Sequence, residues 1–215
     1  MSLLVSLILK DGIIMSSDSR TTWKKKDSVT YTDKTYKTIL MDNRIGISHC
    51  LNATVNGITI HEHLKNFIKI NKGKLITRIP TLLKQYFLEL NPNCKIEFLI
   101  CGYIKEKPYA YRVETQGEIT KLVTSSPNVY WAGERDVPSR LFSEVYLKRT
   151  NQYKLHSSYK LKLDSMSIPE GIDFSEFIIN TAKQVMSYQE CDQTIGGPID
   201  ILILKPYESY WYRRK

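Results

Sequence analysis

The stretch LILKDGIIMSSDSR, residues 7–20, determines how the chain begins to fold. An apolar run that starts near Ser2 ends at Lys10, Asp11-Gly12 supplies a tight turn, and a second apolar run leads to Asp18. An Asp-Gly pair between two apolar runs is a strong local signal for a β-hairpin. The sequence therefore predicts that the chain opens with two paired, buried strands and carries a carboxylate at the end of the second.

Strand-like and helix-like blocks alternate along the rest of the chain. The spacing of apolar residues predicts one pair of helices at about 53–71 and 78–91, and a second pair at 137–149 and 172–190. Strand blocks separated by helix pairs do not suit a parallel βαβ sheet. The prediction is an α+β fold in a single domain, residues 1–215. It is a four-layer αββα sandwich, with two antiparallel sheets face to face and a helix pair outside each.

The overall composition argues against several classes of protein. The 215 residues are 42% apolar and 25% charged, which is typical of a globular domain, and no apolar run approaches the ~18 residues of a membrane span. The first apolar run lacks the preceding basic segment of a secretory signal, so the expected location is the cytoplasm, with no membrane partner. The net charge of +9 comes from scattered residues, which argues against nucleic acid as a partner.

Cysteine and histidine spacing does not match a metal or cofactor site. The four cysteines are Cys50, Cys94, Cys101 and Cys191. They have no CxxC spacing and are expected to be free thiols in a reducing compartment. His61 and His63 lie two residues apart on a predicted helix, where their side chains point apart, and the HExxH spacing is missing. We therefore expect no metal and no cofactor.

Four motifs appear in order along the chain. They are LILKDGIIMSSDSRTT at 7–22, KTILMDNRI at 37–45, WAGER at 131–135 and CDQTIGGPIDILIL at 191–204. Each motif is weak alone, but their order and spacing resemble the proteasome β-type subunit family of N-terminal-nucleophile (Ntn) hydrolases and its bacterial ring-protease relatives. The resemblance covers nearly the whole chain.

The resemblance implies a set of catalytic residues: Ser2, Asp18, Lys37 and Asp192. In the family the first residue of the mature chain is the nucleophile, and counting back from the hairpin puts that position on Ser2, after removal of Met1. The free α-amine of this residue, with a pKa near ~7.7–8.0, would act as the base. Asp18 matches the family carboxylate that keeps the site lysine charged, and Asp192 matches the second site carboxylate.

Some positions leave alternatives or depart from the family pattern. Lys37 matches the site lysine by the apolar spacing that follows it, whereas Lys34 matches better by distance from the first carboxylate; we prefer Lys37. Glu134 and Ile195 occupy positions where the family has serines that help the α-amine pass its proton. The amide that stabilises the oxyanion is expected from the backbone of residues 48–51.

The function implied by the resemblance is hydrolysis of amide bonds. The chain would be a proteasome-like, threonine-type-like peptidase that acts on a peptide or amide substrate and assembles as a homo-oligomer, in a ring or stacked rings. Two alternatives stay open: a catalytically silent subunit that assembles or binds, and a small-molecule amidase on the same fold. Retained Met1 would favour the silent subunit, because a blocked amine cannot act as the base.

Overall fold

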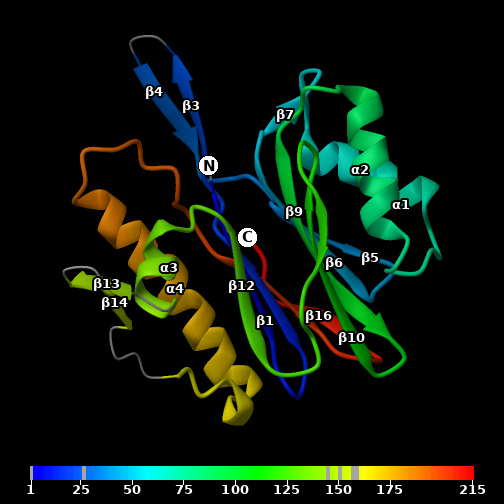
Figure 1. Ribbon diagram of the computed structural model, residues 1–215. Coiled ribbons are helices and arrows are strands. Elements are labelled where there is room, and N and C mark those ends of the chain that lie inside the picture. Colours follow the sequence, from blue (N-terminus) through cyan, green and yellow to red (C-terminus); the bar gives the residue numbers. More distant parts are fainter. Residues whose placement is uncertain (1, 26–27, 144–145, 150–151, 156–159) are drawn as a thin grey trace.

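Two five-stranded antiparallel sheets form the centre of the molecule (Figure 1). The computed structural model describes residues 2–25, 28–143, 146–149, 152–155 and 160–215. The first sheet has the order β12-β1-β2-β15-β16, and β1 and β2 form the predicted opening hairpin. Its strands are β1 (Leu3–Ile8), β2 (Ile13–Ser17), β12 (Asn128–Gly133), β15 (Asp200–Leu204) and β16 (Ser209–Arg213).

The second sheet has the order β11-β10-β9-β6-β5. Its strands are β5 (Thr38–Met41), β6 (Ile45–Leu51), β9 (Ile96–Ile104), β10 (Lys107–Glu114) and β11 (Ile119–Lys121). The central strand β9 is buried along almost its whole length, which explains its nearly continuous apolar sequence. The inner faces of the two sheets share one core, in which Leu4 and Met15 of the first sheet join Leu99 and Cys101 of the second.

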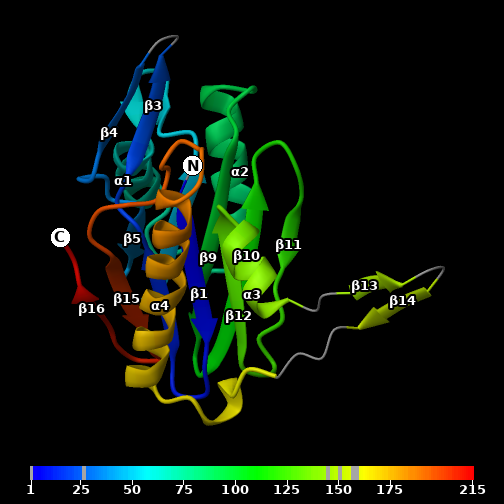
Figure 2. The same ribbon diagram turned by 90° about the vertical axis from the view of Figure 1, so that its left-hand side faces the viewer.

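Three two-stranded ribbons extend from the sheets. They are β3 (Thr21–Lys25) with β4 (Ser28–Thr32), β7 (Thr54–Val55) with β8 (Ile58–Thr59), and β13 (Tyr146–Arg149) with β14 (Gln152–Leu155). The β3–β4 ribbon stands beyond the end of the first sheet, and the β13–β14 ribbon projects to the side of the molecule (Figures 1 and 2). The polar segment at 21–36, for which the sequence allows a loop or an edge hairpin, contains the β3–β4 ribbon.

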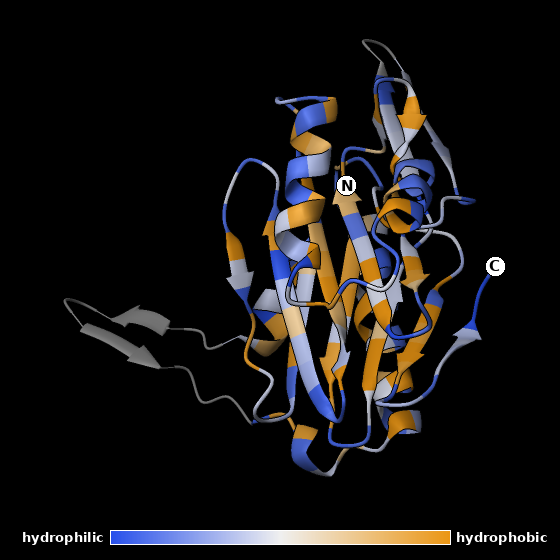
Figure 3. Cartoon of the chain, turned by 90° about the vertical axis from the view of Figure 1, so that its right-hand side faces the viewer, coloured by the Kyte–Doolittle hydropathy of each residue, from blue (hydrophilic) through white to orange (hydrophobic). Residues whose placement is uncertain are grey.

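The helices lie on the outer faces of the two sheets (Figure 2). They are α1 (Ile60–Ile70), α2 (Ile79–Leu90), α3 (Asp136–Phe142) and α4 (Ile168–Ser187), with a 3₁₀ turn at Leu163–Ser165. Helices α1 and α2 bury their apolar stripes against the second sheet, and α4 buries its stripe against β1 and β2. Figure 3 shows the result: apolar residues follow the strands and the inward faces of the helices. In the described ranges, no helix combines the length and apolar character needed to cross a membrane.

The four-layer αββα sandwich predicted from the sequence is wrong as stated. Over the described residues the structure is an α+β fold with four α-helices, two five-stranded sheets and three two-stranded ribbons. In the described residues the two helices beside the first sheet do not contribute equally. Helix α4 contacts β1 and β2, whereas the seven-residue α3 packs mainly against α4. The β7–β8 and β13–β14 ribbons and the short α3 are the features that the sequence did not indicate.

Three predicted helix boundaries also change. The helix predicted at 137–149 ends at Phe142, and residues 146–149 form β13 instead. The helix predicted from residue 53 starts at Ile60, because the preceding residues pair as β7 and β8. The helix predicted from residue 172 starts four residues earlier, at Ile168. Ser167 and Glu170 form a capping box there, and this sequence signal predicts the observed start.

Candidate active site

Asp18 is the centre of the candidate site. It follows β2 directly, so the opening hairpin fixes its position at the end of the first sheet. Its buried carboxylate accepts hydrogen bonds from the main-chain N–H groups of Leu3, Arg20 and Gly196, each at 3.0 Å, and from Lys37 Nζ at 2.7 Å. Four donors around one carboxylate satisfy a charge that would otherwise be costly to bury.

Lys37 is the buried cation of the site. It lies just before β5, and its side chain is only 2% exposed. Burial lowers the pKa of Lys37, and the neighbouring Asp18 carboxylate partly offsets this by favouring the charged form. The alternative lysine, Lys34, lines a different cavity and is not the partner of Asp18. The geometry therefore distinguishes the two lysines that the sequence left open.

The Gly196-Gly197 pair lets the chain approach Asp18 closely. A Cβ atom on Gly196 would collide with the guanidinium of Arg20, which is itself held by Asp33 through two hydrogen bonds of 2.7 and 2.8 Å. Gly197 has a φ of 72°, in the left-handed region that favours glycine. The two glycines thus allow the N–H of Gly196 to reach Asp18, and the Arg20 side chain packs against the loop that contains them.

Ser2 lies next to the buried ion pair and is itself buried. Its carbonyl oxygen accepts a hydrogen bond of 2.8 Å from the N–H of Glu134. Gly133, with a φ of 83°, is packed so closely that a Cβ atom there would collide with the same oxygen. The turn after β12 therefore holds Ser2 in place. Met1, whose removal the predicted chemistry requires, lies outside the described residues.

A cavity of about 300 Å³ opens beside Ser2 and Lys37. The other residues that line it are Thr21, Thr22, Trp23, Lys24, Thr35, His49, Cys50, Leu51, Asn52, Ala53 and Thr54. They come from the β3–β4 ribbon, from the segment before β5, from the end of β6 and from residues 52–54 that follow it. The lining is mainly polar, with hydroxyl, amide and ammonium groups facing one space.

Leu51 is a residue of this cavity that the sequence did not single out individually. It ends β6 with a φ of 76°, which is uncommon for a residue other than glycine and marks a constrained backbone. The N–H of His49 bonds to the carbonyl of Lys37 at 2.9 Å. Because N–H groups alternate along an antiparallel strand, the N–H of Leu51 faces the same edge, which is the cavity edge. Leu51 also lies within the range 48–51, from which the oxyanion amide is expected.

Asp192, the fourth residue that the resemblance implies, does not pair with Lys37, whose partner is Asp18. The Asp192 carboxylate forms an ion pair with Lys24 of the β3–β4 ribbon at 3.0 Å, and it lines a second cavity. The two positions where the resemblance expects serines also differ. Glu134 accepts a hydrogen bond of 2.8 Å from Thr194, and Ile195 is buried among apolar side chains.

Glu97 and Cys50 form a further buried layer that sequence reasoning missed. The Glu97 carboxylate accepts from the N–H of Gly133 at 3.2 Å and from Arg135 at 3.2 Å, and it contacts the Cys50 thiol. Arg112 lies within ion-pair distance at 3.2 Å but is not aligned for a hydrogen bond. Burial and the adjacent carboxylate raise the pKa of Cys50, so this thiol stays protonated. No sequence motif signalled Glu97, since it lies within an apolar strand.

The two histidines of the HEH segment have separate partners. His63 contacts the carbonyl oxygen of Val55 at 2.9 Å, and the centroid of the His61 ring lies 5.3 Å from that of Tyr36. In the parts of the chain that the structure describes, no group of His, Cys, Asp and Glu side chains has a metal-binding arrangement.

No protein-family model matches the sequence, and no curated protein matches it. Solved structures do resemble it. A Gly-1 mutant of Anbu from Hyphomicrobium sp. strain MC1 is 15% identical, with a TM-score of 0.69 over 100% of this chain and 86% of that one. Anbu, described as an ancestral beta-subunit, from Yersinia bercovieri is 14% identical, with a TM-score of 0.67 over 99% of this chain and 88% of that one.

These comparisons correct the family assignment made from the sequence. These similar structures are Anbu proteins, and at 14–15% identity the likeness extends to the fold and does not show membership of the Ntn hydrolase family. With no matching family model, the motif resemblance does not establish that family. The chain is similar to Anbu subunits and has a proteasome-like fold.

Proposed function

We propose that the chain hydrolyses amide bonds in peptides, with Ser2 as the nucleophile once Met1 has been removed. One observation carries this proposal: Ser2 and Lys37, the buried partner of Asp18, line the same polar cavity. Perturbed charges beside a hydroxyl group in a cleft are typical of a reactive site. A buried ammonium has a clear use there, since it stabilises the negative charge that develops on the attacking oxygen.

The proposed reaction needs no histidine. The free α-amine of Ser2 accepts the hydroxyl proton as Oγ bonds to the substrate carbonyl carbon. The C–N bond then breaks, the leaving nitrogen takes the proton from the α-ammonium, and an ester to Ser2 remains. Water, deprotonated by the same amine, attacks the ester carbon; the C–Oγ bond breaks, Oγ takes the proton back from the α-ammonium, and the acid is released. In this scheme Lys37 supplies positive potential, and the N–H of Leu51 is directed at the oxyanion.

The test is peptide hydrolysis by protein whose N-terminus has been verified by mass spectrometry to be Ser2. The rate should rise with pH through about 7–8, as the α-amine loses its proton. Ser2→Ala should abolish turnover. Ser6→Ala is the matched control, because Ser6 is a buried serine on the neighbouring strand β1, and it should keep the wild-type rate. If Ser2→Ala turned over substrate at the wild-type rate, the assignment of Ser2 as the nucleophile would be refuted.

A catalytically silent subunit is the second candidate, and two observations favour it. Asp192 is paired with Lys24 of the β3–β4 ribbon, and Glu134 stands where the resemblance expects a serine. A silent subunit should retain Met1 in the native protein and turn over no substrate. A small-molecule amidase would instead cleave small amides and not peptides.

We also propose that copies of the chain associate, in a ring or stacked rings. The similar Anbu protein from Yersinia bercovieri is described as an ancestral beta-subunit, and a subunit is part of an assembly, which supports association here. Large side chains at the surface also support it, among them Trp23 and Tyr31 of the β3–β4 ribbon and Tyr212 of β16. Sedimentation at micromolar concentration should give a species several times heavier than the 25.0 kDa chain, whereas a monomer alone would contradict the proposal.

A further inference from the structure

A second cavity, of about 340 Å³, lies between the start of α3 and the end of α4. It adjoins the candidate site through Glu134, whose N–H holds the carbonyl of Ser2 at 2.8 Å and whose side chain lines the cavity. The hydrogen bond between Glu134 and Thr194 runs along its edge. If a peptide substrate binds with its reacting carbonyl at Ser2, the side chain of an adjacent substrate residue can therefore reach the second cavity.

The cavity combines an apolar floor with an acidic rim. The floor is formed by Val137, Ala182, Met186 and Ile195, and the carboxylates are those of Glu134, Asp136 and Asp192. Glu134 and Asp136 lie two residues apart at the start of α3, and Asp192 comes from the connection after α4, in a protein with a net charge of +9. An aliphatic stem that ends in a cation matches such a surface, because its methylenes cover apolar atoms while its charge stays at the wet rim.

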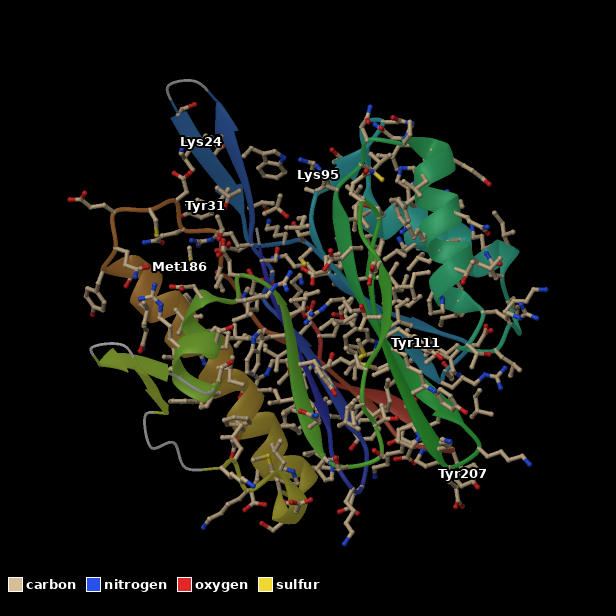
Figure 4. The ribbon with its side chains drawn as sticks, viewed as in Figure 1. Lys24, Tyr31, Lys95, Tyr111, Met186 and Tyr207 are labelled. Atoms are coloured by element: carbon tan, nitrogen blue, oxygen red, sulfur yellow. The ribbon has the colours of Figure 1, made fainter. Side chains whose placement is uncertain are left out.

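The chain itself already brings a lysine to this rim. Lys24 Nζ lies 3.0 Å from the Asp192 carboxylate, although the lysine comes from the β3–β4 ribbon. Figure 4 shows Lys24 on that ribbon and Met186 near the end of α4, on the same side of the molecule. The Lys24 side chain is 72% exposed, so solvent weakens the pair and another ammonium can replace it at little cost.

We infer that this cavity binds the side chain of a lysine in the peptide substrate, next to the bond that Ser2 attacks. The inference rests on the proposed function and names its substrate class. The lysine stem lies on Met186 and Ile195. Its ammonium contacts Asp192 in place of Lys24, and Asp136 beside the exposed Arg140, whose Nε lies 2.9 Å from that carboxylate. The lysine ammonium undergoes no chemistry; it fixes the peptide while the neighbouring amide bond breaks.

Binding to the Ser2→Ala variant tests this without requiring any cleavage. The probes are fluorescent peptides that contain a single lysine, or norleucine or glutamate at the same position. Norleucine has an unbranched stem without the ammonium, so the difference in affinity between the lysine and norleucine peptides measures the effect of the charge. We expect the lysine peptide to bind about three- to tenfold more tightly than the norleucine peptide, and the glutamate peptide to bind most weakly. Equal binding of lysine and norleucine peptides would overturn the inference.

Two variants locate the effect on the rim. Asp136→Asn combined with Asp192→Asn, in the Ser2→Ala protein, should make lysine and norleucine peptides bind alike. Asp173→Asn is the matched control, because Asp173 is an exposed acid near the other end of α4, and it should keep the preference. If the double variant keeps the preference, the cavity is not the site.

Lys24→Met gives a test with the opposite sign. Removing the ammonium of Lys24 should increase the affinity for the lysine peptide about two- to threefold and leave the affinity for the norleucine peptide unchanged. Weaker binding of the lysine peptide by this variant would contradict the inference. Failure of the proposed function is separately visible, because wild-type protein would then bind the lysine peptide and leave it uncut.

Discussion

Two lysine–aspartate pairs reach the cavity beside Ser2 through their lysines, and they differ far more in environment than in geometry. Lys37 and Asp18 are 2.7 Å apart and only 2% and 1% exposed. Lys24 and Asp192 are 3.0 Å apart but 72% and 36% exposed. The distances alone suggest equal partners. Burial separates them, because water screens the second pair and leaves the first nearly unscreened.

The two environments determine what each pair can do. A buried pair that loses one partner leaves an uncompensated charge in the interior, so it is fixed once the protein has folded. An exposed pair exchanges partners at little cost. The Asp18 pair therefore suits constant electrostatic support of a reaction, and the Asp192 pair suits a contact that a ligand can take over.

Loss of the buried pair should destabilise the protein most. Lys37→Met removes the charge but keeps a long side chain, and it leaves Asp18 with only main-chain donors. We expect the free energy of unfolding to fall by about 3 to 5 kcal/mol, measured by urea denaturation followed by fluorescence. Lys34→Met is the control, because Lys34 is close in sequence but not bonded to Asp18, and it should change stability little. A loss below about 1 kcal/mol for Lys37→Met would show that the buried pair is no different from a surface pair.

The pKa of His49 shows how unfavourable a second positive charge is on the buried side of the cavity. Burial and the nearby positive Lys37 lower the pKa of His49 to about 3, against an ordinary value of 6.5. The folded state then binds fewer protons than the unfolded state between these values. Stability is present above pH 6.5 and is lost as the pH falls toward 3. Between pH 7 and pH 4 we expect this residue alone to remove on the order of 3 kcal/mol.

The measurement is urea denaturation at a series of pH values, with His49→Gln as the comparison. Glutamine has polar atoms of similar reach but no proton to gain in this range. The wild type should lose stability about 1.36 kcal/mol per pH unit more steeply than the variant in the acid range. Parallel curves would mean that His49 accepts a proton in the folded state without penalty.

The same contrast explains what the sequence could and could not predict. Asp18 and Lys37 lie at the ends of strands, and the Asp11-Gly12 hairpin sets the register that brings Asp18 to Lys37. Asp192 lies in a connection without helix or strand, so motif spacing could not fix where its side chain goes. A lysine from the separate β3–β4 ribbon reached it, which is a tertiary contact that no local pattern encodes.

The fold shows the same division between strong and weak local signals. The long α2, which has a proline in its first turn and a regular apolar stripe, lies within a residue or two of its predicted range. Residues 137–149 have helical spacing too, but Phe142 packs between Trp131 and Phe174 and the helix stops there. Packing overrode a short apolar pattern, and the first helix of the predicted second pair is shorter than predicted.

Loss of the exposed pair should change stability least. Lys24→Met should lower the free energy of unfolding by less than about 1 kcal/mol, because a lysine that is 72% exposed gains little from a screened partner. Any difference from the wild type should vanish in about 1 M NaCl, where charges are screened within about 3 Å. The loss caused by Lys37→Met should persist in the same salt, since ions do not reach a pair only 1–2% exposed. Urea denaturation of both variants at low and high salt measures the contrast directly. A Lys24→Met loss as large as that of Lys37→Met, or a Lys37→Met loss that disappears in salt, would mean that burial is not what distinguishes the two pairs.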